Sequence, residues 1–382
     1  MLFDQTFKNL KRSREIVAVL MKYGFEDVVT NTSLRKLVPK KRRLTWIRQE
    51  RPVFEYSRWE RIRMVCEELG ATFIKLAQVL SNRPDILPDA LITELQKLQS
   101  EVPPFDFVMV QQIVREETGK ELDELFEYFK EKPIGSASIG QVHRARLKSG
   151  EEVVVKIQRP EVREQVATDL AIMNDIVRMG DKFFERNGIT NTIDVVTAFE
   201  RSMNKELDYT SEARNIKAFR EAYKGHKLFY APKAYKELTT QRFLVLEFVD
   251  GCKITDVEQL KAWGLDPAEI AEIGIDIYLT QIFEHGFFHA DPHPGNVLVR
   301  ADGMLCLIDF GMVGRLMPKD KYAFAGVFIS MAQQDAKGMA DSLRKLSIDD
   351  DINDIRALEY DLNDIIEDFA VLDVSEANMA DL

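Results

Sequence analysis

Residues 289–296, with the sequence HADPHPGN, constrain the fold of this chain more than any other segment. Two prolines and a glycine within this segment prevent a regular helix, so it has to form a loop. His289 and His293 stand four residues apart, as in a helical zinc site, but outside a helix they do not share one face. The segment therefore predicts a loop that performs chemistry rather than a zinc site.

Three polar residues in and after this loop have the spacing of a phosphoryl-transfer site. Asn296 lies five residues after Asp291, and Asp309 follows thirteen residues later, opening the triplet DFG directly after the apolar run LCLI. Phosphoryl transfer needs one carboxylate to orient the attacking hydroxyl, and an amide oxygen and a second carboxylate to hold Mg²⁺ against the triphosphate. The protein-kinase pattern H-x-D-x-x-x-x-N followed by D-F-G has this spacing. We therefore predict that Asp291 orients the acceptor and that Asn296 and Asp309 bind Mg²⁺ and ATP.

A kinase also needs a lysine in a strand to hold the α- and β-phosphates. Lys156 stands in the otherwise apolar run VVVKIQ, where a charge is costly unless it is paired. We expect a helical glutamate as its partner, and of the candidates Glu200 and Glu206 we predict Glu200. The alternative is a lysine at a sheet edge whose ammonium reaches solvent.

The predicted phosphate loop lies before Lys156 and lacks most of the usual glycines. A kinase has G-x-G-x-x-G at this place, whereas this chain has GSASIGQ over 135–141, which makes the loop stiffer. Downstream, LVLEFVDG is interpreted as the hinge, with Leu246 as gatekeeper and the backbone of Glu247 to Val249 offered to adenine. The other residues predicted to contact the nucleotide are Ile134, Gly135, Ser136, Ala137, Ser138, Ile139, Gly140 and Val142.

Hydrophobic periodicity predicts many helices around a small sheet. Helices are expected over 4–24, 57–80, 106–117, 161–186 and 191–222. Strands are expected on both sides of the KSGE turn before Lys156, at 233–237 and 242–248, and as a short pair at NVLV and LCLIDF. The prolines of EVPPFDF, residues 101–107, mark a domain boundary.

Charge is segregated along the chain. Residues 1–63 hold 16 Lys and Arg against 7 Asp and Glu, and the remainder holds 36 against 56. A basic segment with Trp46 fits docking on anionic lipid, although a solvated helical face explains the same charges. The three cysteines form no CxxC pair and no run of 18 apolar residues occurs, so we expect a cytoplasmic protein that does not span a membrane.

Two further motifs complete a resemblance to a known family. The sequence KLAQ lies at 75–78 and ELD at 206–208. The motifs KLAQ, SASIGQVH, ELD, HADPHPGN and DFG follow one another in this order along the chain, and together they resemble the UbiB family of atypical kinase-like proteins. The resemblance implies that Lys75 and Gln78 of a K-x-G-Q motif point into the nucleotide cleft and regulate access. It also implies that Glu206 and Asp208 meet Lys75. The glycine of the family motif is replaced by Ala77, and alanine is also small.

The resemblance implies an α+β, bilobal protein kinase-like fold with a helical N-terminal extension packed over the cleft. The expected regions are a basic arm (1–56), the extension with K-x-G-Q (57–105), a small lobe with inserted helices (106–250) and a large lobe (251–382). The acidic end of that lobe stops without a helix cap, as a truncated lobe would.

The implied function is Mg-ATP binding, with ATP hydrolysis favoured over protein phosphorylation, in support of quinone biosynthesis. Peripheral docking at the inner face of a membrane, through anionic or quinone-like lipid, is expected. The alternatives are a pseudokinase scaffold that binds nucleotide or lipid, and a small-molecule kinase of the aminoglycoside or choline type, which shares the HADPHPGN-like loop but lacks K-x-G-Q. Nucleic-acid binding is not expected, because the basic arm lacks interleaved aromatic residues.

Overall fold

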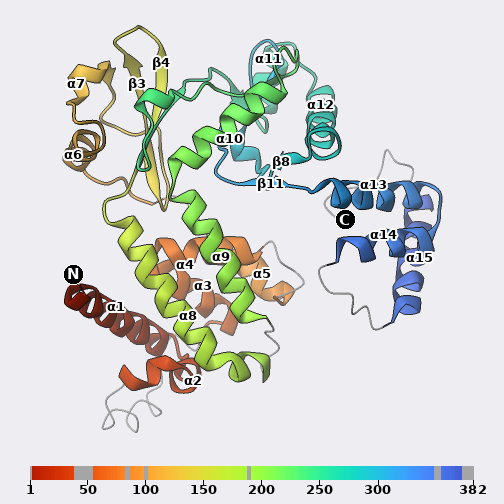
Figure 1. Ribbon diagram of the computed structural model, residues 1–382, viewed down its shortest axis with the longest axis horizontal. Helices are drawn as coiled ribbons and strands as arrows, with labels where there is room; N and C mark the ends of the chain where they lie inside the picture. Colours follow the sequence, from red (N-terminus) through yellow and green to blue (C-terminus); the bar gives the residue numbers. More distant parts are fainter. Residues whose placement is uncertain are drawn as a thin grey trace. The chain divides into compact units, whose positions relative to one another are not determined.

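The computed structural model describes residues 2–37, 55–81, 87–98, 102–186, 191–347 and 354–371. Trp46, most of the basic segment around it and the end of the acidic tail lie outside these residues. The chain forms two compact units (Figure 1): Met1–Ala218 with Pro232–Val249, and Phe219–Ala231 with Asp250–Leu382. The short segment Phe219–Ala231 therefore belongs to the second unit, although it falls inside the region predicted as the small lobe.

The first unit begins with helices, and two of them replace one predicted helix. These helices are α1 (Leu2–Lys22), α2 (Glu26–Asn31), α3 (Arg58–Leu69), α4 (Ala71–Ser81) and α5 (Asp89–Leu95). The single helix predicted over 57–80 is wrong, because the chain breaks at Gly70 with φ 87° and ψ −158°. Glycine adopts this backbone conformation almost alone, since a Cβ atom would clash with the backbone.

A buried carboxylate fixes the break between α3 and α4. Asp169, fully buried on α8 (Val162–Arg186), accepts hydrogen bonds from Arg12 Nε (2.7 Å) and Thr72 Oγ1 (2.7 Å). The same guanidinium donates to the Leu69 carbonyl oxygen at 2.6 Å. These bonds connect α1, the start of α4 and α8, so they set where α4 begins, one turn before Lys75.

The sheet of the first unit is antiparallel, in the order β1–β3–β4–β6, and β2 pairs with β3. Its strands are β1 (Phe126–Phe129), β2 (Gly135–Ser136), β3 (Gly140–Leu147), β4 (Glu152–Gln158) and β6 (Phe243–Glu247). Alternate residues of β4 are fully buried against α6 (Phe107–Thr118), and the short α7 (Leu122–Leu125) precedes β1. The strand predicted at 233–237 is wrong, since a lone bridge from Ala234 to Leu246 and a 3₁₀ turn at Lys236–Leu238 stand there.

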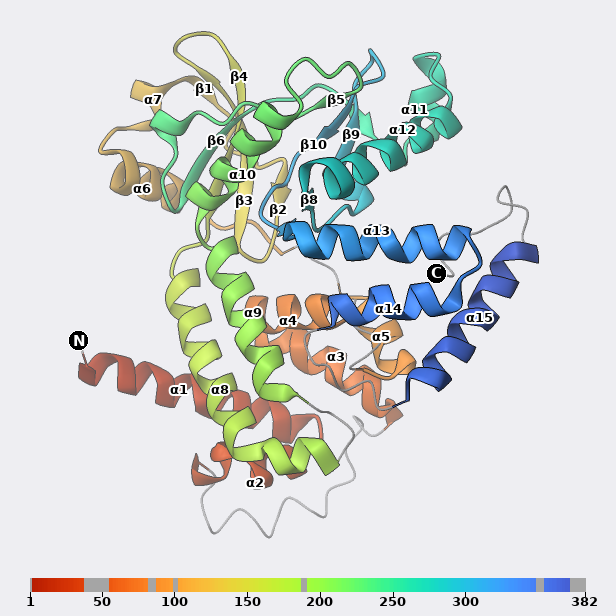
Figure 2. The same ribbon diagram turned by 45° about the vertical axis from the view of Figure 1, so that its right-hand side comes forward.

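A second predicted helix, 191–222, is also broken. The structure has α9 (Thr192–Glu206), which runs beside α8 in both views (Figures 1 and 2), and then α10 (Tyr209–Ala222). The buried Gln158 side chain, at the end of β4, donates to the Leu207 carbonyl oxygen at 2.6 Å. Asp208 then accepts the Thr210 N–H at 3.1 Å and begins α10.

The second unit combines two small sheets with helices. One sheet has the order β5–β10–β9–β7, from Phe229–Tyr230, Leu305–Leu307, Val297–Val299 and Cys252–Lys253, and in the other β8 (Phe287–His289) pairs with β11 (Val313–Arg315). The helices are α11 (Val257–Ala262), α12 (Pro267–Thr280), α13 (Pro318–Ala332), α14 (Ala336–Leu346) and α15 (Ile355–Val371). In the described part of the chain, no helix is long and apolar enough to cross a membrane.

Candidate phosphoryl-transfer site

The HADPHPGN segment forms a loop between two strands of the second unit, as its prolines and glycine predict. β8 ends at His289, which pairs with Val313 of β11, and β9 begins at Val297. Between them, Pro294 opens a 3₁₀ turn that ends at Asn296. His293 caps this turn, because its Nδ1 accepts the Gly295 N–H at 3.0 Å, so its role is local and structural.

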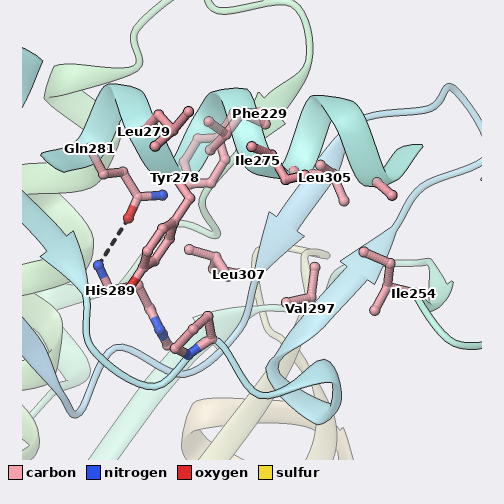
Figure 3. Close-up of a pocket in the computed structure, with 14 residues that line it drawn as sticks. Phe229, Ile254, Ile275, Tyr278, Leu279, Gln281, His289, Val297, Leu305 and Leu307 are labelled. Atoms are coloured by element: carbon pink, nitrogen blue, oxygen red, sulfur yellow. Dashed lines mark hydrogen bonds between the residues drawn. The ribbon is translucent and has the colours of Figure 1, made fainter. Parts of the chain in front are cut away.

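His289 connects this loop to the DFG segment. Its imidazole Nδ1 accepts the Asp291 N–H at 3.3 Å, and its Nε2 lies against the carbonyl oxygen of Asp309. A backbone N–H only donates and a carbonyl oxygen only accepts, so Nδ1 is the acceptor and Nε2 the donor of this ring. The backbone N–H of His289 in turn donates to Gln281 Oε1 at 2.9 Å (Figure 3). This almost fully buried ring therefore positions Asp291 and Asp309 together.

The predicted residues Asp291, Asn296 and Asp309 are brought together inside the second unit. The side-chain nitrogen of Asn296 donates to the Asp291 carboxylate at 3.3 Å and to its carbonyl oxygen at 3.2 Å. The backbone carbonyl oxygen of Asn296 accepts the N–H of Ile308, the residue before Asp309, at 3.1 Å. Since the side-chain nitrogen of Asn296 donates to Asp291, the side-chain oxygen of Asn296 is the atom suited to a metal ion.

Asp309 and Phe310 of the DFG triplet are fixed by a hydrogen bond from a backbone N–H and by aromatic packing, respectively. One Asp309 carboxylate oxygen accepts the Gly311 N–H at 2.9 Å. Phe310 is fully buried, with its ring 5.0 Å from that of Phe219 and 5.6 Å from that of His289. In the described residues, no cluster of three or more His, Cys, Asp and Glu side chains could hold a metal. The Asn296 and Asp309 pair still fits Mg²⁺, which takes few protein ligands and completes its shell with phosphate oxygens and water.

An apolar cavity of about 370 Å³ has His289 among its lining residues. Its lining includes Ile275 and Leu279 of α12 and Val297 and Leu305 of the sheet (Figure 3). Asp291, Asn296 and Asp309 are not among its lining residues, so the three predicted residues do not open into it.

In the first unit Lys156 is paired, but not with the predicted residue. Its Nζ lies 2.5 Å from Glu212 Oε1 of α10, and the two side chains are only 12% and 6% exposed. The predicted pairing with Glu200 is wrong, because Glu200 lies on α9 and accepts from Asn174 of α8 at 3.2 Å. The sequence gives no clear sign of the break at Leu207 and Asp208, which makes α10 rather than α9 the helix that supplies the glutamate.

The expected contact of Lys75 with Glu206 is present, with 2.8 Å between Nζ and Oε1. Asp208 is used differently, because its carboxylate accepts from Thr210 and Ser211 at the start of α10. Partial burial favours a higher pKa for Asp208, but these hydrogen bonds outweigh it and keep the pKa below its usual value. Ala77 is buried in a leucine cluster with Leu87, Leu91 and Leu95.

Gln78 is half-buried, on the turn of α4 after Lys75. Its backbone carbonyl accepts the Ser81 hydroxyl at 2.8 Å. A position within a helix of the extension is what the K-x-G-Q resemblance implies, and its regulatory role remains a prediction.

The predicted phosphate loop is held at both ends. Ile134 N–H donates to the Val142 carbonyl at 2.8 Å, and Ala137 N–H to the Gly140 carbonyl at 2.8 Å. Ile139 packs with buried residues of α8 and α9. Gly140 has to be glycine, because a Cβ atom there would lie 2.5 Å from the Ile157 carbonyl oxygen.

At the predicted hinge, Leu246 is buried in β6. The Glu247 N–H donates to the Lys233 carbonyl at 2.9 Å, and the Glu247 carboxylate accepts the Lys233 N–H at 3.0 Å. Val249 ends the first unit, one residue before the chain enters the second. Adenine contacts at these positions remain predictions.

Known proteins resemble this chain in sequence and in fold. A profile of the ABC1 atypical kinase-like domain matches residues 97–343. A Pseudomonas fluorescens protein named probable protein kinase UbiB is 35% identical over 87% of this chain and 63% of its own length. An uncharacterized Synechocystis protein is 39% identical over 74% of this chain and 50% of its own length. The solved complex of Rv3197 with erythromycin from Mycobacterium tuberculosis has a TM-score of 0.57 at 25% identity, over 80% of this chain and 78% of that one.

The chain thus spans between half and two thirds of the length of these two sequence relatives. The profile match runs through the 135–141 loop, Lys156 and the segment from Asp291 to Asp309. It covers more than half of the chain, and the structural neighbour agrees with a kinase-like fold. The chain therefore belongs to the ABC1 family of atypical kinase-like proteins, the family of the UbiB relatives that its motifs resemble.

Proposed function

We propose that this protein binds Mg-ATP and transfers its γ-phosphoryl group, with water as the main acceptor. The observation that carries the proposal is the buried His289 ring, which contacts the backbone of both Asp291 and Asp309, with Asn296 bound to the Asp291 carboxylate. A structural scaffold has no need of this set, whereas phosphoryl transfer uses each member. The names of the UbiB relatives, probable protein kinases, support the same class of activity.

Each residue has a separate task in this proposal. Asn296 and Asp309 would hold Mg²⁺, which neutralises charge on the transferring phosphoryl group. Asp291 orients the attacking water or hydroxyl and takes its proton. Lys156, kept in place by Glu212, holds the α- and β-phosphates. Lys75 and Gln78 regulate access, and the ion pair of Lys75 with Glu206 fixes the lysine that would do so.

Steady-state release of phosphate from Mg-ATP tests the proposal. We expect Asp291→Asn to lower kcat at least about 100-fold, because a positioned base contributes on the order of 10² or more. Asp276→Asn, on the exposed face of α12, is the matched control and keeps wild-type kcat. Nucleotide binding without hydrolysis in the wild type would favour the pseudokinase scaffold. Equal activity of Asp291→Asn and the wild type would contradict the assignment of Asp291.

We further propose that the protein works at the cytoplasmic face of a membrane in support of quinone biosynthesis, as the family resemblance implies. The basic segment around KKRR, residues 40–43, supplies the charge for anionic lipid, at about 1 kcal/mol per residue near the surface. Replacing these four residues by glutamine should reduce co-sedimentation with phosphatidylserine vesicles at least tenfold at ~0.1 M salt, and leave the weak binding to phosphatidylcholine unchanged.

A control variant neutralises four exposed lysines outside this segment, at positions 120, 132, 148 and 224. Its total charge change is the same, so it should keep most of the vesicle binding. Equal losses in the two variants would mean that net charge, and not the basic segment, drives the association.

A further inference from the structure

Arg159 binds the predicted phosphate loop from one side. It stands directly after β4, three residues beyond Lys156. Its Nε donates to the Ala137 carbonyl oxygen at 2.8 Å, and its Nη2 donates to Ser136 Oγ at 2.9 Å. The Arg159 backbone N–H donates to the Ile139 carbonyl oxygen at 2.8 Å. Arg159 therefore holds three positions, 136, 137 and 139, of a loop that the sequence makes poor in glycine.

The same guanidinium also binds the segment that leads from the N-terminal helices into the sheet. Its Nη2 donates to the Pro103 carbonyl at 2.9 Å, and its carbon lies 5.7 Å from the centre of the Phe105 ring. Val102 N–H closes the arrangement by donating to the Ser136 carbonyl at 3.3 Å. Arg159 thus joins three segments, namely the loop, the lead-in segment 102–105 and the end of the strand that carries Lys156.

The lead-in segment is anchored a second time, by side chains inside the sheet. Gln141 Oε1 accepts the Phe105 N–H at 3.0 Å, and Gln141 and His143 are hydrogen-bonded to each other at 2.9 Å. Burial lowers the pKa of His143, which favours its neutral form in this position. The segment is therefore a fixed support against which Arg159 can hold the loop.

The chemistry of these contacts favours phosphate. Among the described residues, all the acceptors of the Arg159 guanidinium are neutral carbonyl or hydroxyl oxygens. Its contact occupies the Ala137 carbonyl oxygen of the loop, which would repel a phosphate, and no carboxylate of the described residues accepts from the guanidinium. The guanidinium presents five N–H donors in a rigid plane, whereas a lysine ammonium presents three donors on a flexible stem and holds its acceptors less precisely.

We infer that Arg159 is a positioning residue that holds loop 135–140 in the conformation that receives the nucleotide phosphates, at a fixed place relative to Lys156. The inference rests on the proposed function and deepens it. Loop 135–140 contains alanine and is stiff, so a contact from outside the loop can fix its conformation. A glycine-rich loop is instead flexible and can move onto its ligand. Because the Arg159 contacts fix the loop in the absence of nucleotide, their loss should weaken the binding of the phosphates and not that of the nucleoside.

Calorimetric titration with Mg-ATP and with adenosine separates these two effects. We expect Arg159→Gln to weaken Mg-ATP binding about tenfold or more, the size of a lost charged hydrogen bond, and to change adenosine binding less than about twofold. Arg159→Lys keeps the charge without the fork and should show a smaller loss for Mg-ATP. The matched control is Arg146→Gln on β3, whose side chain is 40% exposed and pairs with Glu152 at 2.6 Å, and it should bind both ligands as the wild type does.

Hydrogen–deuterium exchange without nucleotide provides a second measurement. In Arg159→Gln the amide hydrogens of 134–140 and those of Val102 and Phe105 should exchange faster, and the amide hydrogens of α8 and α9 should exchange as in the wild type. An unchanged ratio of the dissociation constants for Mg-ATP and adenosine, with both weakened equally or neither weakened, would overturn the inference while leaving the proposed function in place. If Arg159→Gln does not fold, Arg159→Lys decides by the same ratio. A wild type that binds no Mg-ATP would remove the proposed function and this inference with it.

Discussion

At the scale of single residues, Lys156 and Glu212 form a buried ion pair in which each charge depends on the other. The sequence predicts that Lys156 needs a partner, since it interrupts an apolar strand. The choice of partner was not predictable, because it depends on a helix break at Leu207 and Asp208 that periodicity does not reveal. By contrast, the proximity of Asp291, Asn296 and Asp309 could be predicted, because their spacing along the chain is itself the signal.

Removing either partner of such a pair leaves an uncompensated buried charge. We expect Glu212→Ala to lower the free energy of unfolding by roughly 3 kcal/mol. Glu200→Ala removes one hydrogen bond with Asn174 and should cost about 1 kcal/mol. Urea denaturation of the two variants measures both values. A larger loss for Glu200→Ala than for Glu212→Ala would contradict the pairing described here.

At the scale of elements, two helix breaks position the polar residues of the first unit. Amphipathic periodicity continues across Gly70 and across 207–208, so the sequence predicts unbroken helices at both places. Long-range contacts decide otherwise, through the Asp169 network at one break and Gln158 at the other. The positions of Lys75 and Glu212 follow from these contacts, which lie far apart in the sequence.

Gly70 tests the first break. Gly70→Ala should lower the free energy of unfolding by about 1–3 kcal/mol, because a side chain at φ 87° is strained against its own backbone, although no atom beyond the two neighbouring residues lies within 4 Å of the added Cβ. Gly135→Ala is the matched control, with the same open space and no positive φ, and should be nearly neutral. Thermal unfolding followed by circular dichroism compares them. If Gly70→Ala were as stable as Gly135→Ala, α3 and α4 could form one helix.

At the scale of the whole molecule, the chain divides its candidate residues between two units. The first carries the 135–141 loop, Lys156, Glu212 and the Lys75–Glu206 pair, and the second carries Asp291, Asn296 and Asp309. Sequence motifs identified the family and the kinase-like fold, because motif order survives where helix boundaries do not. The basic segment around Trp46 lies outside the described residues, so its part in membrane docking remains a prediction.

The most direct test of the central claim is thermal unfolding with ATP, with and without Mg²⁺, for the wild type and Asp309→Asn. Asparagine can still accept the Gly311 N–H but lacks the charge that Mg²⁺ needs. At 100 times its Kd, Mg-ATP should stabilise the wild type by about 2.7 kcal/mol, a shift of several degrees, only when Mg²⁺ is present. Asp309→Asn should show no such shift. An equal Mg²⁺-dependent shift in both proteins would contradict the assignment of Asp309, and no shift in either would contradict a nucleotide site in this chain.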